Sequence, residues 1–95
     1  MNKSKIKKWN TAEHLRNSKE IDAYLQASFA ENDEKQIIRA LDNAVRAQGM
    51  LDVARKTGRD RAGLYRALSG KKDPRLSTII KVASACGGRI VYVPK

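Results

Sequence analysis

The sequence predicts an all-α fold of five helices followed by one short C-terminal β-strand. Apolar residues recur at helical spacing through most of the chain, and capping residues and glycines separate the periodic stretches. β-Branched and aromatic residues follow one another at residues 90–93, within the segment 89–93 that is predicted as a strand. Because 95 residues hold a single core, we expect a basic arm with a short helix at residues 1–16 and one domain at residues 17–95.

The short helix of the arm is expected at about residues 11–16, with Thr11 as its cap. The first long helix follows from about residue 17. Asn17 or Ser18 can cap it, and Glu20 stands three residues after Asn17, as a capping box requires. One face of this helix carries Ile21, Tyr24, Leu25, Ser28 and Phe29.

The second long helix is expected at residues 33–48. Asn32 and Asp33 end the preceding helix, and Asp33 forms a second capping pair with Gln36. Gly49 is a natural stop, because glycine enters the left-handed conformation without strain. The inner stripe of this helix comprises Ile37, Leu41, Ala44, Val45 and Gln48, with Ile38 beside it.

Three short helices and a strand complete the fold. Helices at residues 51–57 and 61–69 are separated by Gly58, and Leu51 and Val53 are expected to face inward. A fifth helix runs from about residue 76 to 86 before the pair Gly87-Gly88. The strand at residues 89–93 needs a partner for its backbone groups. The fifth helix is expected to place on one face Leu76, Ile79, Ile80, Ala83 and Cys86.

The net charge of +10 is distributed unevenly. Residues 1–16 carry five Lys or Arg against one acid, and residues 49–75 carry eight against three. Residues 17–48 are instead acidic, with six Asp or Glu against four bases. A positive excess concentrated in one segment favours a polyanionic partner.

Several classes of protein are excluded. One cysteine, Cys86, cannot form an internal disulfide, and with one histidine, His14, it cannot complete a structural zinc site. We therefore expect no metal, no cofactor and no catalytic residues, and hence no enzyme. No apolar run reaches the roughly 20 residues that span a bilayer, and no apolar core follows the basic N-terminus. The expected location is the cytoplasm, with no membrane partner.

Residues 50–69, MLDVARKTGRDRAGLYRALS, have the spacing of a helix-turn-helix motif. Ala54 lies where the two helices meet, and a larger side chain would separate them. Gly58, four residues later, supplies the positive φ of the turn. Asp60 can cap the second helix, and Leu64 seats it on the core.

The outward face of the second motif helix is expected to enter the major groove of double-stranded DNA. Arg61 and Arg66 can each bind a guanine edge, and Ala62 can contact a thymine methyl group. Tyr65 either stacks on a sugar or fills the edge of the domain, and Ser69 lies near the helix end. The residues placed to neutralise phosphates are Arg55, Lys56, Arg59, Lys71, Lys72 and Arg75.

Residues 50–87 resemble the Xre/Cro-type repressors. The run ALSGKKDPRLSTIIKVASACG is similar to the second half of these proteins. The resemblance implies an Xre/lambda-repressor-like domain. The whole chain, from about Lys8 to Pro94, resembles the HigA-like addiction-module antidote proteins. The matching stretches are Lys8-Trp9, residues 12–15 (AEHL), 21–25 (IDAYL), 47–50 (AQGM), 63–69 (GLYRALS) and 88–94 (GRIVYVP).

This resemblance implies the antitoxin of a type II toxin–antitoxin module. Such proteins neutralise a RelE/ParE-like (HigB-like) toxin and repress their own operon. The alternative is a stand-alone Xre-type transcriptional repressor without a toxin. The sequence departs from the family pattern at Leu51 and Arg75, where capping or small residues are usual, and at Arg59, where an apolar residue is usual.

Two further surfaces are expected. A homodimer would give two recognition helices, with the strand residues Ile90, Val91, Tyr92 and Val93 pairing with those of a second copy. The arm and the first long helix are expected to hold the toxin, because the DNA face carries the positive excess. The residues expected to contact the toxin are Trp9, Leu15, Ile21 and Tyr24. The alternatives are that Trp9 folds back onto the core of its own domain, or that the lysines of the arm follow DNA phosphates.

Overall fold

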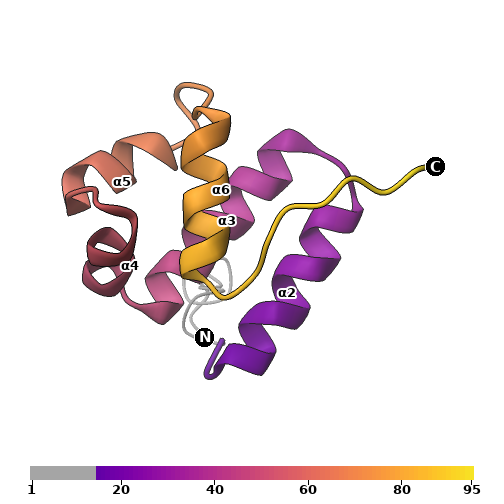
Figure 1. Ribbon diagram of the computed structural model, residues 1–95, viewed down its shortest axis with the longest axis horizontal. Coiled ribbons are helices and arrows are strands. Elements are labelled where there is room, and N and C mark those ends of the chain that lie inside the picture. Colours follow the sequence, from indigo (N-terminus) through magenta and orange to yellow (C-terminus); the bar gives the residue numbers. More distant parts are fainter. Residues whose placement is uncertain (1–14) are drawn as a thin grey trace, which may run out of the picture.

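The computed structural model describes residues 15–95 and shows an all-α architecture in that range (Figure 1). Trp9, His14 and most of the expected helix at residues 11–16 lie outside the described residues, and Leu15 and Arg16 are not helical. Five helices are described: α2 (Ser18–Ala30), α3 (Glu34–Gln48), α4 (Met50–Thr57), α5 (Arg61–Ala67) and α6 (Leu76–Ala85).

Helices α2 and α3 form a hairpin whose ends are defined by capping residues (Figure 1). The Asn17 side chain accepts a hydrogen bond from the Glu20 backbone N–H at 2.9 Å, and Asp33 accepts one from Gln36 at 3.0 Å. Asn32 adopts a left-handed φ of 55° between the helices. Both predicted capping positions are therefore confirmed.

The core is built around α3. Ala40, Leu41, Ala44 and Val45 on this helix are completely buried, and α2, α4 and α6 all pack against it. The other helices add to the same cluster Ile21, Val53, Ala54, Leu64, Leu68, Val82, Ala85 and Cys86. The packed faces of α3 and α4 include the buried alanines Ala40, Ala44 and Ala54. Their small side chains let neighbouring helices approach closely.

Gln48 joins three helices at the end of α3. Its Nε2 donates to the Ala85 carbonyl oxygen of α6 at 2.8 Å and to Asp52 Oδ2 of α4 at 3.2 Å. The first bond satisfies one of the carbonyl groups that a helix C-terminus leaves unpaired. A polar residue at the edge of the apolar stripe thus fixes the relative positions of α3, α4 and α6.

Two of the expected inward faces are wrong in part. Val53 is buried as expected, but Leu51 is 61% exposed, because residues two apart on a helix point roughly 200° apart. On α6, the expected positions Ile79, Ala83 and Cys86 do pack on the core, whereas Leu76 and Ile80 are exposed. The buried face of α6 is shifted toward Thr78, Val82 and Ala85.

The predicted C-terminal strand is also wrong for this chain by itself. Helix α6 ends at Ala85; just beyond its cap, Gly87 has a φ of 94°, and the Gly88 N–H donates to the Ala83 carbonyl oxygen at 2.9 Å. The tail that follows leaves α6 as a single trace with no strand among the described residues (Figure 1). A strand requires a partner for its ladder of hydrogen bonds, and the described chain supplies none. Within residues 15–95 no helix is long and apolar enough to cross a membrane.

Candidate nucleic-acid interface

The turn between α4 and α5 lies where the sequence predicted it, at residues 58–60. Gly58 ends α4 in the left-handed conformation, with a φ of 76°, and the Arg59 N–H donates to the Ala54 carbonyl oxygen at 3.1 Å. Asp60 caps α5 by accepting a hydrogen bond from the Gly63 N–H at 2.8 Å. Ala54 is only 4% exposed at the junction of the two helices. The roles predicted for Gly58 and Asp60 are confirmed.

Helix α5 exposes one continuous face at the edge of the molecule (Figure 1). It is seated by Leu64, which is fully buried, and the chain just beyond it by Leu68. The five residues that were expected to point outward are all exposed: Arg61, Ala62, Tyr65, Arg66 and Ser69. They are therefore accessible to a partner.

A hollow lies between α5, the loop at residues 69–75 and the start of α6, and we call it the α6-side hollow. Its only acidic lining residue is Asp73. The cationic lining residues are Arg59, Arg66, Lys71, Lys72 and Arg75. Such an excess of positive charge beside α5 suits a polyanion. Arg75 begins α6 without a side-chain cap.

Arg59 differs from the other cations because it is half-buried. Its Nη2 donates to the Thr78 hydroxyl at 2.9 Å, and Thr78 is only 2% exposed. The guanidinium therefore joins the α4–α5 turn to α6. Arg59 fills a position where the family resemblance implies an apolar residue, and the hydrogen bond to Thr78 compensates part of the cost of burying a charge.

Two further cations extend from the last turn of α4. Asp52 lies 3.5 Å from Arg55 and 3.3 Å from Lys56. The hydrogen bond from Gln48 lowers the pKa of Asp52, and that from Lys56 lowers it further. Asp52 thus stays ionised at neutral pH, and it orients Arg55 and Lys56 while leaving both side chains largely exposed.

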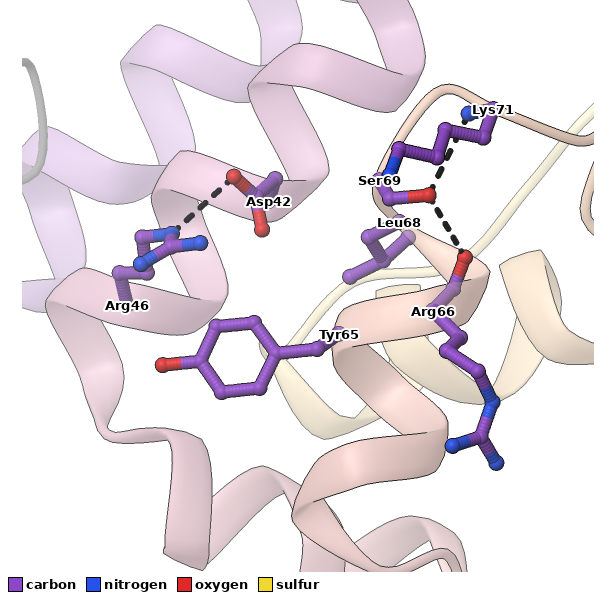
Figure 2. Close-up of a pocket in the computed structure, with 7 residues that line it drawn as sticks. All are labelled: Asp42, Arg46, Tyr65, Arg66, Leu68, Ser69 and Lys71. Carbon is purple, nitrogen blue, oxygen red and sulfur yellow. Dashed lines mark hydrogen bonds and ion pairs between the residues drawn. The ribbon is translucent and has the colours of Figure 1, made fainter.

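On its other side, α5 faces α3 through Tyr65 (Figure 2). The Arg46 guanidinium lies over the Tyr65 ring, 4.9 Å from its centroid, and Arg46 Nε donates to Asp42 at 3.0 Å. These residues line a second hollow with Arg66, Leu68, Ser69 and Lys71, which we call the α3-side hollow. Sequence analysis missed Arg46, because an Asp–Arg pair four residues apart is ordinary on a helix surface.

The residues expected to contact a toxin occupy different environments. Ile21 is only 5% exposed and belongs to the core, so it offers no contact surface in this structure. Leu15 is half-buried against that core. The Tyr24 hydroxyl accepts a hydrogen bond from Asn43 at 2.9 Å and holds α2 on α3. Trp9 lies outside the described residues.

The tail residues expected at a dimer contact are all exposed. Ile90 is 39% exposed, Val91 59%, Val93 73% and Tyr92 90%. No hydrogen bond joins the backbone of residues 89–95 to other described residues. The tail therefore presents apolar side chains together with unpaired backbone groups.

The described residues include no cluster suited to a metal ion, and the single cysteine is buried. No cluster of three or more His, Cys, Asp or Glu in the described part of the chain could hold a metal ion. Cys86 is buried, and desolvation raises the pKa of its thiol to about 11. A thiol with that pKa is a poor nucleophile at neutral pH.

The sequence profile of a family described as "Probable addiction module antidote protein" matches residues 5–94. An uncharacterized protein of Haemophilus influenzae is 40% identical over 80 residues, which cover 84% of this chain and 82% of that protein. The chain belongs to the addiction module antidote family. No solved structure is significantly similar to it.

Membership of the addiction module antidote family has two consequences. An antidote is not an enzyme, which agrees with the expectation from the sequence. An antidote also implies a toxin that it counteracts. The exposed cationic surface around α5 and the exposed apolar tail are the features of this antidote that need a functional explanation.

The first prediction concerns the cap that orients α5 in this antidote. Asp60→Ala should lower the free energy of unfolding by about 1 kcal/mol through loss of the cap. A Cβ on Gly63 would lie 2.7 Å from Asp60 Oδ1, so Gly63→Ala should not stabilise the native chain. In the Asp60→Ala variant the same change should stabilise by up to about 1 kcal/mol through helix propensity. Urea unfolding of the four chains measures this coupling, and additive effects would contradict it.

Proposed function

We propose that this chain is the antitoxin of a type II toxin–antitoxin module. It would neutralise a RelE/ParE-like (HigB-like) toxin and repress its own operon through an Xre/lambda-repressor-like domain at residues 17–95. Membership of the antidote family supports the first activity. The observation that carries the second is the exposed face of α5, which bears Arg61 and Arg66 between two hollows lined by cations.

In the proposed complex, α5 enters the major groove with its N-terminal end toward the base edges. Arg61 and Arg66 each donate two hydrogen bonds to a guanine, and Ala62 contacts a thymine methyl group. The loop cations Lys71, Lys72 and Arg75, together with Arg55 and Lys56, neutralise phosphates. Arg59 contributes mainly by holding the turn, because its guanidinium is bonded to Thr78.

The proposed antitoxin acts as a homodimer, because one α5 helix reads only a few base pairs. Two copies would present their α5 helices to half-sites roughly 34–36 Å apart. The tail residues 90–93 are the proposed contact, in antiparallel pairing with the same residues of the second copy. Their exposed apolar side chains and unpaired backbone support this pairing.

The toxin would bind an acidic surface of the antitoxin, on a different part of the chain from the cationic DNA face. RelE/ParE-like toxins act on RNA or nucleic-acid-associated targets and tend to be basic, as the family resemblance implies. Five acidic residues of the α2–α3 hairpin are exposed: Glu20, Asp22, Glu31, Asp33 and Glu34. We propose that the segment from about Trp9 to Asp33 holds the toxin, with Trp9 as an anchor. Ile21 would support this surface from the core rather than touch the toxin.

The second prediction tests the reading of DNA. Arg61→Ala and Arg66→Ala should each lose roughly 1–3 kcal/mol of discrimination between particular base pairs. Lys72→Ala should instead weaken binding evenly across sequences and lower the salt dependence by about one unit. The measurement is the dissociation constant on duplexes from upstream of the gene and on scrambled duplexes. Identical behaviour of all three variants on both duplexes would exclude this face of α5.

The third prediction tests the dimer. A chain that ends after Gly88 should sediment as a monomer at concentrations where the full chain is a dimer. Because a strand ladder requires backbone N–H groups, Val91→Pro should have a similar effect, whereas Val91→Thr should remain dimeric. A truncated chain that stays dimeric would exclude the tail as the main contact.

The fourth prediction separates toxin binding from DNA binding. Deletion of residues 1–14 keeps Leu15 on the core and should abolish growth rescue when the small protein encoded beside this chain is expressed with it. Trp9→Ala should reduce rescue, and operator binding should be retained by both variants. Intact neutralisation with weaker, less salt-sensitive DNA binding would instead assign the arm to phosphate contact. Absence of any complex with the neighbouring protein would favour a stand-alone repressor.

A further inference from the structure

We propose that the α3-side hollow is a seat for a DNA backbone phosphate, with Arg46 of α3 as its principal contact. This inference rests on the proposed DNA binding and extends the contact surface beyond the helix-turn-helix. It assigns to Arg46 a role that neither its sequence position nor the motif indicates. The argument follows from how Arg46 is held, from what faces it and from where it lies relative to α5.

Arg46 is held on two sides (Figure 2). Its Nε donates to Asp42 Oδ2 at 3.0 Å, and its guanidinium plane lies over the Tyr65 ring, 4.9 Å from the centroid. The two terminal nitrogens make no hydrogen bond to another residue in the range 15–95. A guanidinium with two free N–H groups on one edge matches the two oxygens of a phosphate. Because the side chain is already ordered, binding loses little conformational entropy.

A second cation faces the same space. The Lys71 side chain extends from the loop after α5 back over Ser69 toward α3 (Figure 2). The Arg66 guanidinium points in another direction, so Arg46 and Lys71 are the cations that serve this hollow. Asp42 is the acidic lining residue, and its carboxylate is bonded to Arg46. The hollow therefore has a net positive charge and opens beside the exposed face of α5.

The position of the hollow fits the geometry of a major groove. A helix in the groove has a phosphate backbone on each side, because the groove is only about 12 Å wide. The α6-side hollow supplies cations on one flank of α5. The α3-side hollow supplies cations on the flank of α5 that faces α3. Arg46 reaches this flank from α3, whose buried stripe fixes its position.

Asp42 allows a test in which substitutions of Arg46 and of Asp42 should change DNA affinity in opposite directions. If the pair only stabilises the fold, Arg46→Ala should leave the salt slope unchanged, and Asp42→Asn should have the same effect on DNA affinity whether residue 46 is Arg or Ala. If the hollow holds a phosphate, Asp42 competes with that phosphate for Arg46. Arg46→Ala should then weaken binding and Asp42→Asn should strengthen it.

The experiment measures the dissociation constant of the full-length chain on the duplex from upstream of its gene, over 50–200 mM salt. Arg46→Ala should lower the slope of log affinity against log salt by about one unit. Its deficit relative to the native chain should thus shrink roughly fourfold across that range. Arg46→Lys should keep most of the slope with reduced affinity, because it retains charge but loses the planar two-pronged contact. Asp42→Asn should bind more tightly with a steeper slope.

Arg39→Ala is the matched control, because Arg39 is an exposed arginine of α3 two turns before Arg46 and bonds only to Gln36 among the described residues. Its slope should stay close to that of the native chain. An Arg46→Ala slope equal to the native one, or equal losses in Arg39→Ala and Arg46→Ala, would overturn the phosphate seat while leaving sequence-specific binding intact. A native chain that does not bind the duplex would overturn both proposals.

Tyr65 provides a second, independent readout through a double-mutant cycle. Tyr65→Ala removes the platform under Arg46, so its effect on affinity should be several-fold smaller when Arg46 is already alanine. An equal loss in both backgrounds would mean that Tyr65 acts on DNA without Arg46, and would overturn the positioning role assigned to the ring.

Discussion

The direction of α5 depends on the reversal of the chain at residues 58–60, and the cationic surface around α5 depends on that direction. Gly58 turns the backbone in a left-handed conformation, Arg59 bonds to both Ala54 and Thr78, and Asp60 caps the next helix. Each residue of the turn has its own fixed interaction. The turn is therefore over-determined, which suits a helix that packs mainly on α4 and presents its other face to a partner.

The acidic residues around α5 order the cations rather than cancel them. Asp52 contacts Arg55 and Lys56, and Asp42 contacts Arg46. Each carboxylate offsets one positive charge of the surface while it positions the side chain that it contacts. Exposed ion pairs of this kind add little to stability. They reduce the number of conformations that a long side chain must lose on binding. A basic surface with a few well-placed carboxylates can therefore bind more selectively than one built from lysine and arginine alone.

The predictable part of the fold is the part encoded by local chemistry. Asn17, Asp33, Asp60 and Gly58 act within one helical turn of themselves, so their positions could be inferred without the tertiary structure. Helix α4 has only two turns, and its apolar pattern did not show that Leu51 would be exposed.

The remaining errors depend on neighbours that are remote in sequence. The orientation of α6 is set by its packing on α3 and α4, which buries Thr78 and leaves Leu76 outside. The predicted strand had the right composition, but residues 15–95 supply no partner for its backbone. The outward face of α5 followed from the motif, whereas Arg46 reaches that surface only because α3 passes beside Tyr65.

The exposed tail also bears on how far self-association of this protein can proceed. A β-prone segment with unpaired backbone is a template for open-ended stacking into fibres. Here the apolar run Ile90–Val93 is bounded by Arg89 on one side and by Pro94 and Lys95 on the other. Charges and proline at the ends of such a run act as gatekeepers against aggregation. The residues that flank this apolar run therefore disfavour growth into a filament, and the pairing proposed for the tail would remain closed at two copies.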